Sequence, residues 1–305
     1  MTRFLVTGVS GLLGLNFALA VDGKKHHIIG VANTTALTWA DFEFRQAELT
    51  EPGIVEKLVA ETKPDVILHC AAIANLEACE ADPQRAIEVN GILPEVIAQS
   101  ALKHGIQMIH ISTDAVFDGT KGNYTETDEP NPLSVYARTK LQGEQAVLAA
   151  NCQAMVARVN FYGWSTSGTR SLAEFFVNNL EQGRPVKGFT DVLFCPMMVL
   201  DLADMLVEAA EKNLQGIYHL VGAQFMSKYD FGLAIARTFG FDPALISPAL
   251  VSEGGLKAAR SPNLTLDTGK VTAALGHDLP DFEHGLAKFY AQYRHGFPQY
   301  IRSLA

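Results

Sequence analysis

A glycine-rich turn between an apolar strand and an apolar helix constrains this chain more than any other feature. Phe4–Thr7 is typical of a buried strand, and the turn from Gly8 through Gly11 to Gly14 leads into an apolar helix that reaches Ala20. Glycines let the backbone turn tightly and approach a pyrophosphate, whose charge then rests on the free N–H groups of the helix N-terminus. A plain strand-to-helix turn is the structural alternative. The turn therefore predicts a dinucleotide site.

Strands and helices alternate along the first half of the chain. With helical patterns between them, further strands are expected at His27–Ala32, Asp65–Cys70, Met108–Thr113 and Met155–Val159. Such alternation is typical of an α/β fold with a Rossmann-type, doubly wound parallel sheet. We expect a dinucleotide-binding domain over residues 1–160 and a smaller, partly interleaved C-terminal substrate lobe over 161–305. Residues of about 197–221 are expected to return to the Rossmann sheet.

Tyr136 and Lys140 are candidate catalytic residues, because they lie at i and i+4 of a helical pattern and so about 6 Å apart on one face. A phenol titrates near ~10 and a lysine near ~10.4, so an ammonium beside the phenol favours phenolate. Tyr136 could then act as a general acid or base, while Thr113 holds a substrate oxygen. Such a Tyr/Lys pair arises by chance in about a third of chains like this one. The pair indicates a catalytic site only because the glycine turn and the strand-end Ser112–Thr113 accompany it.

The end of the second expected strand bears on the choice of dinucleotide. Asn33 and its neighbours offer no carboxylate to repel a 2′-phosphate and no arginine to bind one, which favours NADP(H) slightly over NAD(H). Glu48 and Leu49 are candidate adenine contacts, with an ordinary surface acid as the alternative. Ala71 and Ala72 are small enough for a backbone to lie against the cofactor, although packing explains them equally well.

Two polar residues have both a functional and a structural interpretation. Asn90 falls inside a long helical pattern over Pro83–Lys103, where asparagine is a poor helix former. It either makes a buried hydrogen bond or places a water near Lys140. Arg260 lies in a loop and could bind a phosphate, while a solvated arginine is the commoner case.

Composition narrows the class of protein. The net charge of -9 and the pI near 5.5 provide no basic surface for nucleic acid or an anionic membrane. No apolar run is long enough for a membrane span, and no signal peptide precedes the first strand. The cysteines lack metal-ligand spacing, which predicts reduced thiols and a cytoplasmic location. The expected partner is a small-molecule substrate, and a homodimer is one assembly left open.

These motifs resemble those of the extended short-chain dehydrogenase/reductase family over nearly the whole chain. Within that family the chain is most similar to dTDP-4-dehydrorhamnose reductases, through STDAVFDG (112–119), PLSVYARTKLQGE (132–144) and ARSPNLTLDTGKV (259–271). The resemblance implies an NAD(P)H-dependent reductase of a nucleotide-linked 4-keto sugar or a similar carbonyl compound. Tyr136 would donate the proton, Thr113 would orient the substrate oxygen, and Lys140 would bind the nicotinamide ribose and lower the tyrosine pKa.

The resemblance also supplies candidate contacts. The catalytic set is Thr113, Tyr136 and Lys140. The substrate set is Thr113, Asp114, Asn160 and Arg260. The cofactor set is Gly8, Ser10, Gly11, Leu12, Leu13, Gly14, Asn33, Glu48, Leu49, Cys70, Ala71, Ala72, Asn90, Ser112, Tyr136 and Lys140.

Departures from the reductase pattern keep other functions open. Apolar residues replace polar or small ones within 191–197, which would make the substrate pocket drier, and Asn16 replaces a glutamate that helps hold magnesium in some members, so we predict no metal. One alternative is a non-catalytic NADP-binding regulatory subunit, similar to that of methionine adenosyltransferase. Another is an NAD-dependent sugar-nucleotide epimerase or a dehydratase. Retention of Thr113, Tyr136 and Lys140 favours an enzyme.

Overall fold

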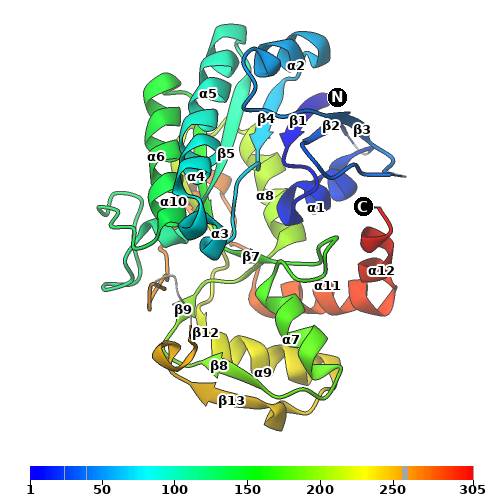
Figure 1. The fold of residues 1–305 in the computed structure, drawn as a ribbon, viewed down its shortest axis with the longest axis vertical. Helices are drawn as coiled ribbons and strands as arrows, with labels where there is room; N and C mark the ends of the chain where they lie inside the picture. Colours follow the sequence, from blue (N-terminus) through cyan, green and yellow to red (C-terminus); the bar gives the residue numbers. More distant parts are fainter. Residues whose placement is uncertain (24, 39, 256–259, 305) are drawn as a thin grey trace.

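A parallel sheet organises the computed structural model, which describes residues 1–23, 25–38, 40–255 and 260–304. Its strands are β1 (Thr2–Thr7), β2 (His26–Ala32), β3 (Glu43–Gln46), β4 (Val66–His69), β5 (Gln107–Thr113), β6 (Met155–Val159) and β11 (Gly216–Leu220). In the described part of the chain their order is β11-β6-β5-β4-β1-β2-β3, and each neighbouring pair is parallel. This arrangement confirms the Rossmann-type α/β prediction (Figure 1).

Helices cover both faces of this sheet, as the buried apolar strands require. They are α1 (Leu12–Val21), α2 (Ile54–Thr62), α3 (Leu76–Ala81), α4 (Pro83–Ala86), α5 (Leu93–His104), α6 (Val135–Ala150), α8 (Val199–Glu211) and α10 (Gly269–Leu275). α1 packs against α8, while α5 packs against α2 and α6. The strand order reverses between β1 and β4, and ligands of doubly wound sheets bind in the crevice at such a reversal.

The long helix expected over Pro83–Lys103 is interrupted. A π-helical segment, Ile87–Ile92, separates α4 from α5. Asn90 lies within it, and its amide accepts from Ile73 N at 2.9 Å and donates to Ile73 O at 3.0 Å. The Asn90 side chain thus makes buried hydrogen bonds from the wider π turn, which explains why an asparagine occurs inside this helical segment. Helical periodicity alone did not indicate the interruption.

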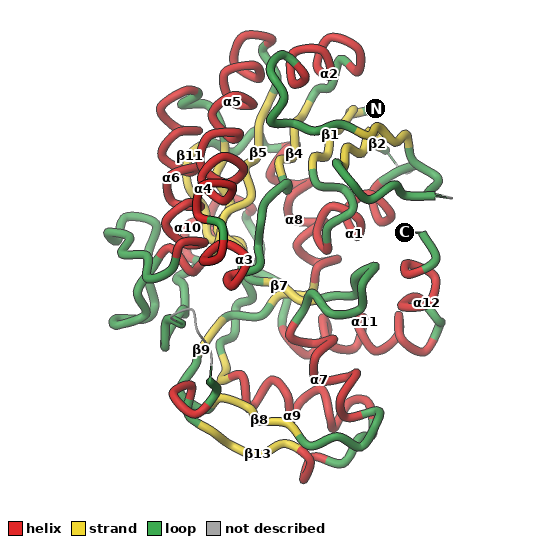
Figure 2. Tube along the Cα trace, in the orientation of Figure 1, coloured by secondary structure: helices red, strands yellow, loops and turns green. Residues whose placement is uncertain are grey.

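A second region of short strands and long loops lies beside the sheet (Figures 1 and 2). It contains β7 (Phe161–Tyr162), β8 (Val186–Phe189), β9 (Leu193–Phe194), β10 (Met197–Met198), β12 (Met226–Ser227), β13 (Ile246–Ala249), α7 (Leu172–Leu180), α9 (Lys228–Phe239), α11 (Phe282–Arg294) and α12 (Phe297–Arg302). An aromatic cluster around Tyr162, Phe231 and Phe289 fills its interior. β11 pairs with β6 in the large sheet and α8 packs against α1, although both follow residue 160. The division into 1–160 and 161–305 stays a prediction.

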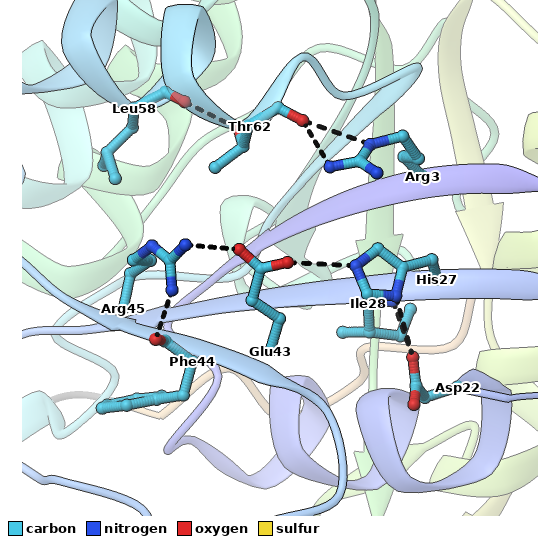
Figure 3. Close-up of polar contacts among 9 residues, drawn as sticks. All are labelled: Arg3, Asp22, His27, Ile28, Glu43, Phe44, Arg45, Leu58 and Thr62. Carbon is cyan, nitrogen blue, oxygen red and sulfur yellow. Dashed lines mark hydrogen bonds and ion pairs between the residues drawn. The ribbon is translucent and has the colours of Figure 1, made fainter.

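Polar contacts tie the strands at the β3 edge of the sheet together. Glu43 lies between Arg45, at 2.6 Å, and His27, at 3.1 Å, and on the neighbouring strand Arg3 donates to the carbonyl oxygen of Thr62 at 2.8 Å (Figure 3). Charged side chains on an edge strand discourage pairing with another chain. Across the described residues, no helix has the length and apolarity that crossing a bilayer would need.

Candidate active site

A cleft of about 830 Å³ opens at the carboxyl ends of the strands and joins a cavity of about 310 Å³. The cleft brings together residues from the glycine turn, the ends of β5 and β6, and α6. Of the predicted contacts, it is lined by Gly8, Gly11, Leu12, Leu13, Gly14, Cys70, Ala72, Ser112, Thr113, Tyr136, Lys140 and Arg260. The smaller cavity adds Ser10, Asn33, Glu48, Leu49 and Ala71. Residues far apart in the sequence therefore line two adjoining cavities.

The glycine turn has a shape that other residues could not adopt. Gly8 has φ +67, and a Cβ on it would lie 2.7 Å from the backbone of Ala71. A Cβ on Gly14 would lie 2.6 Å from the carbonyl oxygen of Gly8. The turn therefore brings β1, α1 and the residues after β4 close together, with the N-terminus of α1 facing the cleft. This cradle fits a dinucleotide pyrophosphate, which backbone N–H groups and a helix N-terminus bind.

The structure places Tyr136 opposite Thr113. Ser134 caps α6 by accepting from Ala137 N at 3.2 Å, which positions Tyr136 in the first turn of the helix. Burial, together with the charge of Asp114, raises the pKa of Tyr136 to about 12, while the Thr113 hydroxyl acts in the opposite direction. The phenol consequently keeps its proton at neutral pH and is suited to act as an acid.

Lys140 is buried and hydrogen-bonded to the end of β5. Its ammonium donates to the carbonyl oxygen of Ile111 at 2.6 Å and lies 3.4 Å from Nε2 of His110. Burial lowers the pKa of Lys140 to about 8. Burial raises the pKa of Tyr136, opposite to the direction expected from the sequence, while the effect of Lys140 on that phenol stays a prediction. Lys140 still lines the cleft, where it can donate to a bound ligand.

Two buried histidines beneath the site were not singled out from the sequence. His69 and His110 are partners across β4 and β5, and their rings stack at 5.2 Å. Thr7 Oγ1 lies 2.7 Å from Nδ1 of His69. Burial lowers the pKa of both imidazoles, so both are neutral at pH 7. The sequence feature that could have indicated them is a histidine near the end of each of two apolar strands.

Three residues predicted to contact ligands use their side chains for hydrogen bonds within the protein. Asp114 is buried, accepts from Asn160 at 2.5 Å and from Thr113 at 3.0 Å, and has its pKa raised to about 6 by burial. The Ser112 hydroxyl donates to Glu144 at 2.5 Å, away from the cleft. Asn90 is fully buried and holds Ile73, which lines the smaller cavity; its contact with the cofactor stays a prediction.

A cavity of about 80 Å³ adjoins the cleft and is lined by two cationic side chains. Arg260 lines both spaces and pairs with Glu77 at 3.6 Å. Lys228, at the start of α9, was not predicted from the sequence, because nothing in a helical pattern shows which cavity its first residue faces. Burial and the neighbouring Arg260 lower the pKa of Lys228. Asn160 and the apolar Phe194 also line this cavity.

The adenosine side of the cleft corrects a second expectation. The sequence indicated neither an acid nor an arginine near the end of β2, yet both are present. Glu48 accepts from Asn33 and lies 2.9 Å from Arg85, which reaches the cavity from α4. Sequence spacing could not reveal this pair, since four elements, β3, α2, β4 and α3, lie between Asn33 and Arg85.

The chain is similar to a known protein family over most of its length. The family model described as RmlD substrate binding domain matches residues 2–295. This chain belongs to the RmlD family. The match confirms the resemblance to extended short-chain dehydrogenase/reductases.

Relatives of this RmlD-family chain have different functions. It is 32% identical to a probable low-salt glycan biosynthesis reductase of Haloferax volcanii, covering 94% of this chain and 97% of the relative. It is also 32% identical to methionine adenosyltransferase 2 subunit beta of Rattus norvegicus, covering 91% and 84%. The crystal structure of a dTDP-4-dehydrorhamnose reductase from Clostridium acetobutylicum has a TM-score of 0.84 at 27% identity, covering 96% and 99%.

Asn16, at the position where some relatives would hold magnesium, has a structural role in this chain. Asn16 is buried in α1 and donates to the carbonyl oxygens of Leu12 and Trp164, both at 2.8 Å. It therefore links α1 to the loop that follows β7. Among the described residues, no cluster of three His, Cys, Asp or Glu side chains could hold a metal ion. The absence of a metal stays a prediction.

Proposed function

We propose that this protein is an NAD(P)H-dependent reductase of a nucleotide-linked 4-keto sugar or a closely similar carbonyl compound. One observation carries the proposal: Tyr136 is half-buried, protonated at neutral pH and opposite Thr113, in the same cleft as the glycine cradle. Reduction of a carbonyl needs a proton at the oxygen while hydride reaches the carbon. A protonated phenol beside a hydroxyl supplies both the acid and an oxygen-binding group.

In this proposal, different residues of the chain have different roles. Gly8, Gly11 and Gly14 would hold the pyrophosphate of the dinucleotide, and Lys140 would donate to its ribose. The dinucleotide, when bound, supplies the hydride. Thr113 orients the substrate oxygen, and Tyr136 gives it a proton. Asp114 and Asn160 keep the end of β5 in place behind these groups.

The substrate class rests on the cations beside the reaction centre. Arg260 and Lys228 face one small cavity that adjoins the cleft at Arg260. Two cations with a common opening favour an anionic substrate, because their mutual repulsion falls when an anion lies between them. The diphosphate of a nucleotide sugar meets this need, while Asn160 and Ser134 offer polar contacts for a sugar.

Binding of NADPH at least as tight as that of NADH is part of this proposal. Glu48 would repel a 2′-phosphate, but it is already paired with Arg85, whose second nitrogen lies 2.6 Å from Glu88. Opening of the Glu48–Arg85 pair would present a guanidinium to the phosphate. Titration of each dinucleotide, followed by nicotinamide fluorescence, tests this, and a clear preference for NADH would contradict it.

The test of the function is to follow NADPH and NADH absorbance with a panel of nucleotide 4-keto sugars and simpler carbonyl compounds. Stoichiometric oxidation of the dinucleotide supports a reductase. An epimerase or dehydratase would return the dinucleotide unchanged. Asp114 is followed by Ala115, without the acid that dehydratases of this type usually carry, which argues against dehydration.

A regulatory subunit is the second candidate, favoured by the similarity to methionine adenosyltransferase 2 subunit beta. Such a protein would bind a dinucleotide tightly without oxidising it. Retention of Thr113, Tyr136 and Lys140 around the cleft favours catalysis. Tight dinucleotide binding with no turnover across the whole panel would reverse this preference.

A further inference from the structure

The two parts of the cleft meet at a narrow group of residues. The larger part contains Tyr136 and Lys140, and the smaller part contains Asn33 and Glu48. Among the described residues, those that line both parts are Gly8, Ala72 and Arg170. A dinucleotide with its nicotinamide near Tyr136 and its adenosine near Asn33 would place its pyrophosphate at this junction. Arg170 is the one charged residue in that group.

The side chain of Arg170 lies over the glycine turn. A Cβ built on Gly11 would be 3.8 Å from Nη1 of Arg170, so the guanidinium stands at the N-terminal end of α1. Within the described part of the chain, no side-chain hydrogen bond or ion pair engages this guanidinium. An exposed cation without a partner, next to the positive end of a helix, is repelled by its surroundings until an anion lies between them.

The loop that carries Arg170 is held rigidly. The buried carboxylate of Glu174, in α7, accepts from Arg170 N at 2.9 Å, Ser171 N at 3.1 Å and Ser165 N at 2.7 Å. Asn178 also donates to Gly168 O at 2.6 Å. A fixed loop of this kind preorganises the arginine, which reduces the loss of conformational freedom on binding. The loop connects β7 to α7, so it comes from a different part of the chain than the glycine turn between β1 and α1 (Figure 1).

We propose that Arg170 binds the cofactor pyrophosphate from the side opposite the glycine turn, and so links dinucleotide binding to the loop between β7 and α7. The inference rests on the dinucleotide binding in the proposed function. A planar guanidinium can contact two phosphate oxygens at once, whereas the α1 N-terminus contributes backbone N–H groups. Sequence reasoning missed Arg170, because it lies in a polar loop with no motif around it.

The test is equilibrium binding of NADH and NADPH, without substrate, to the parent protein and to Arg170→Met. Loss of a charged contact to phosphate should weaken both dinucleotides by about 10–100-fold and reduce the salt dependence of binding. Arg170→Lys, which keeps the charge, should recover part of the loss. Arg184→Met removes an exposed arginine just beyond α7 and should bind like the parent. All variants should keep the parent's melting temperature without ligand.

A variant of the loop anchor separates direct contact from loop disorder. Glu174→Gln weakens the anchor but leaves the guanidinium, so it should reduce affinity less than Arg170→Met. The double variant should bind no more weakly than Arg170→Met alone, since both changes act through one contact.

Other outcomes overturn the inference. A loss confined to NADPH would assign Arg170 to the 2′-phosphate instead, and equal affinity of Arg170→Met and parent would remove it from the site. Failure of the proposed function gives a different result: the parent would bind both dinucleotides with the Arg170 dependence described, yet would reduce no carbonyl compound.

Discussion

Tyr136 is the residue on which catalysis depends most directly. Tyr136→Phe keeps the ring and removes the proton, so kcat should fall by about 10²–10⁴-fold while dinucleotide affinity changes little. Steady-state kinetics with a reducible substrate, together with a fluorescence titration of NADPH, measures the two quantities separately. Tyr300→Phe, at an exposed position, is the matched control. Parent-like turnover by Tyr136→Phe would show that another group delivers the proton.

Lys140 should leave a signature in the pH dependence of stability. Burial lowers its pKa from 10.5 to about 8, so between these values the unfolded chain binds more protons at this residue than the folded chain does. The contribution of Lys140 to the free energy of unfolding must therefore rise as pH increases from about 8 towards 10.5. Urea denaturation at pH 7.5 and 9.5 should show a rise in the parent that is smaller in Lys140→Met. Equal pH dependence in the two proteins would mean that Lys140 titrates normally.

A buried ion pair connects the elements beneath the active site. Arg158 of β6 lies 2.7 Å from Glu144 of α6, and both side chains are 2% exposed. Arg158→Met leaves the carboxylate buried without its partner and should lower the free energy of unfolding by about 3–5 kcal/mol. Glu144→Leu combined with Arg158→Met should recover much of this loss, because no unpaired charge remains.

Urea denaturation of both single variants and the double variant measures the coupling between Arg158 and Glu144. Lys103→Met, which breaks the exposed pair with Glu56, should change stability little. Additive effects of the two buried substitutions would contradict the pairing.

The whole molecule should be stabilised by its dinucleotide. A ligand that binds the folded state at 100 times its Kd adds about 2.7 kcal/mol, so NADPH should raise the Tm of the parent and of Tyr136→Phe alike. Gly8→Ala should abolish this rise, because its Cβ would meet the backbone of Ala71. Gly276→Ala is the matched control: its φ of +82 is equally unsuited to alanine, but no atom lies within 4 Å of the added carbon. Thermal unfolding of Gly8→Ala and Gly276→Ala with and without NADPH measures the difference between these variants.

The sequence was sufficient for the sheet and for the residues that adjoin its strands. Alternating apolar runs and helical periodicity predicted β1, β2, β4, β5 and β6, and the glycine turn, Thr113 and Tyr136 followed from positions at strand ends or helix starts. The missed residues, Arg85, Arg170 and Lys228, come from helices and loops that meet the cleft only after folding. Local sequence gives their charge but not the cavity they face. The direction of the Tyr136 pKa shift was missed for a related reason, since burial depends on the whole fold.

The π-helical turn at Ile87–Ile92 has a consequence for how the chain tolerates insertions and deletions. A π turn holds one more residue than an α turn at almost the same length, so it acts as a one-residue insertion whose excess stays local. Deletion of that residue would leave a continuous α-helix in which α4 and α5 keep their relative orientation. The same extra residue held in unbroken α-helical turns would instead rotate α4 by about 100° relative to α5, and Arg85 would point away from the adenosine cavity although no residue that touches it had been substituted. The π turn therefore keeps Arg85 beside Glu48 in a chain that carries the extra residue.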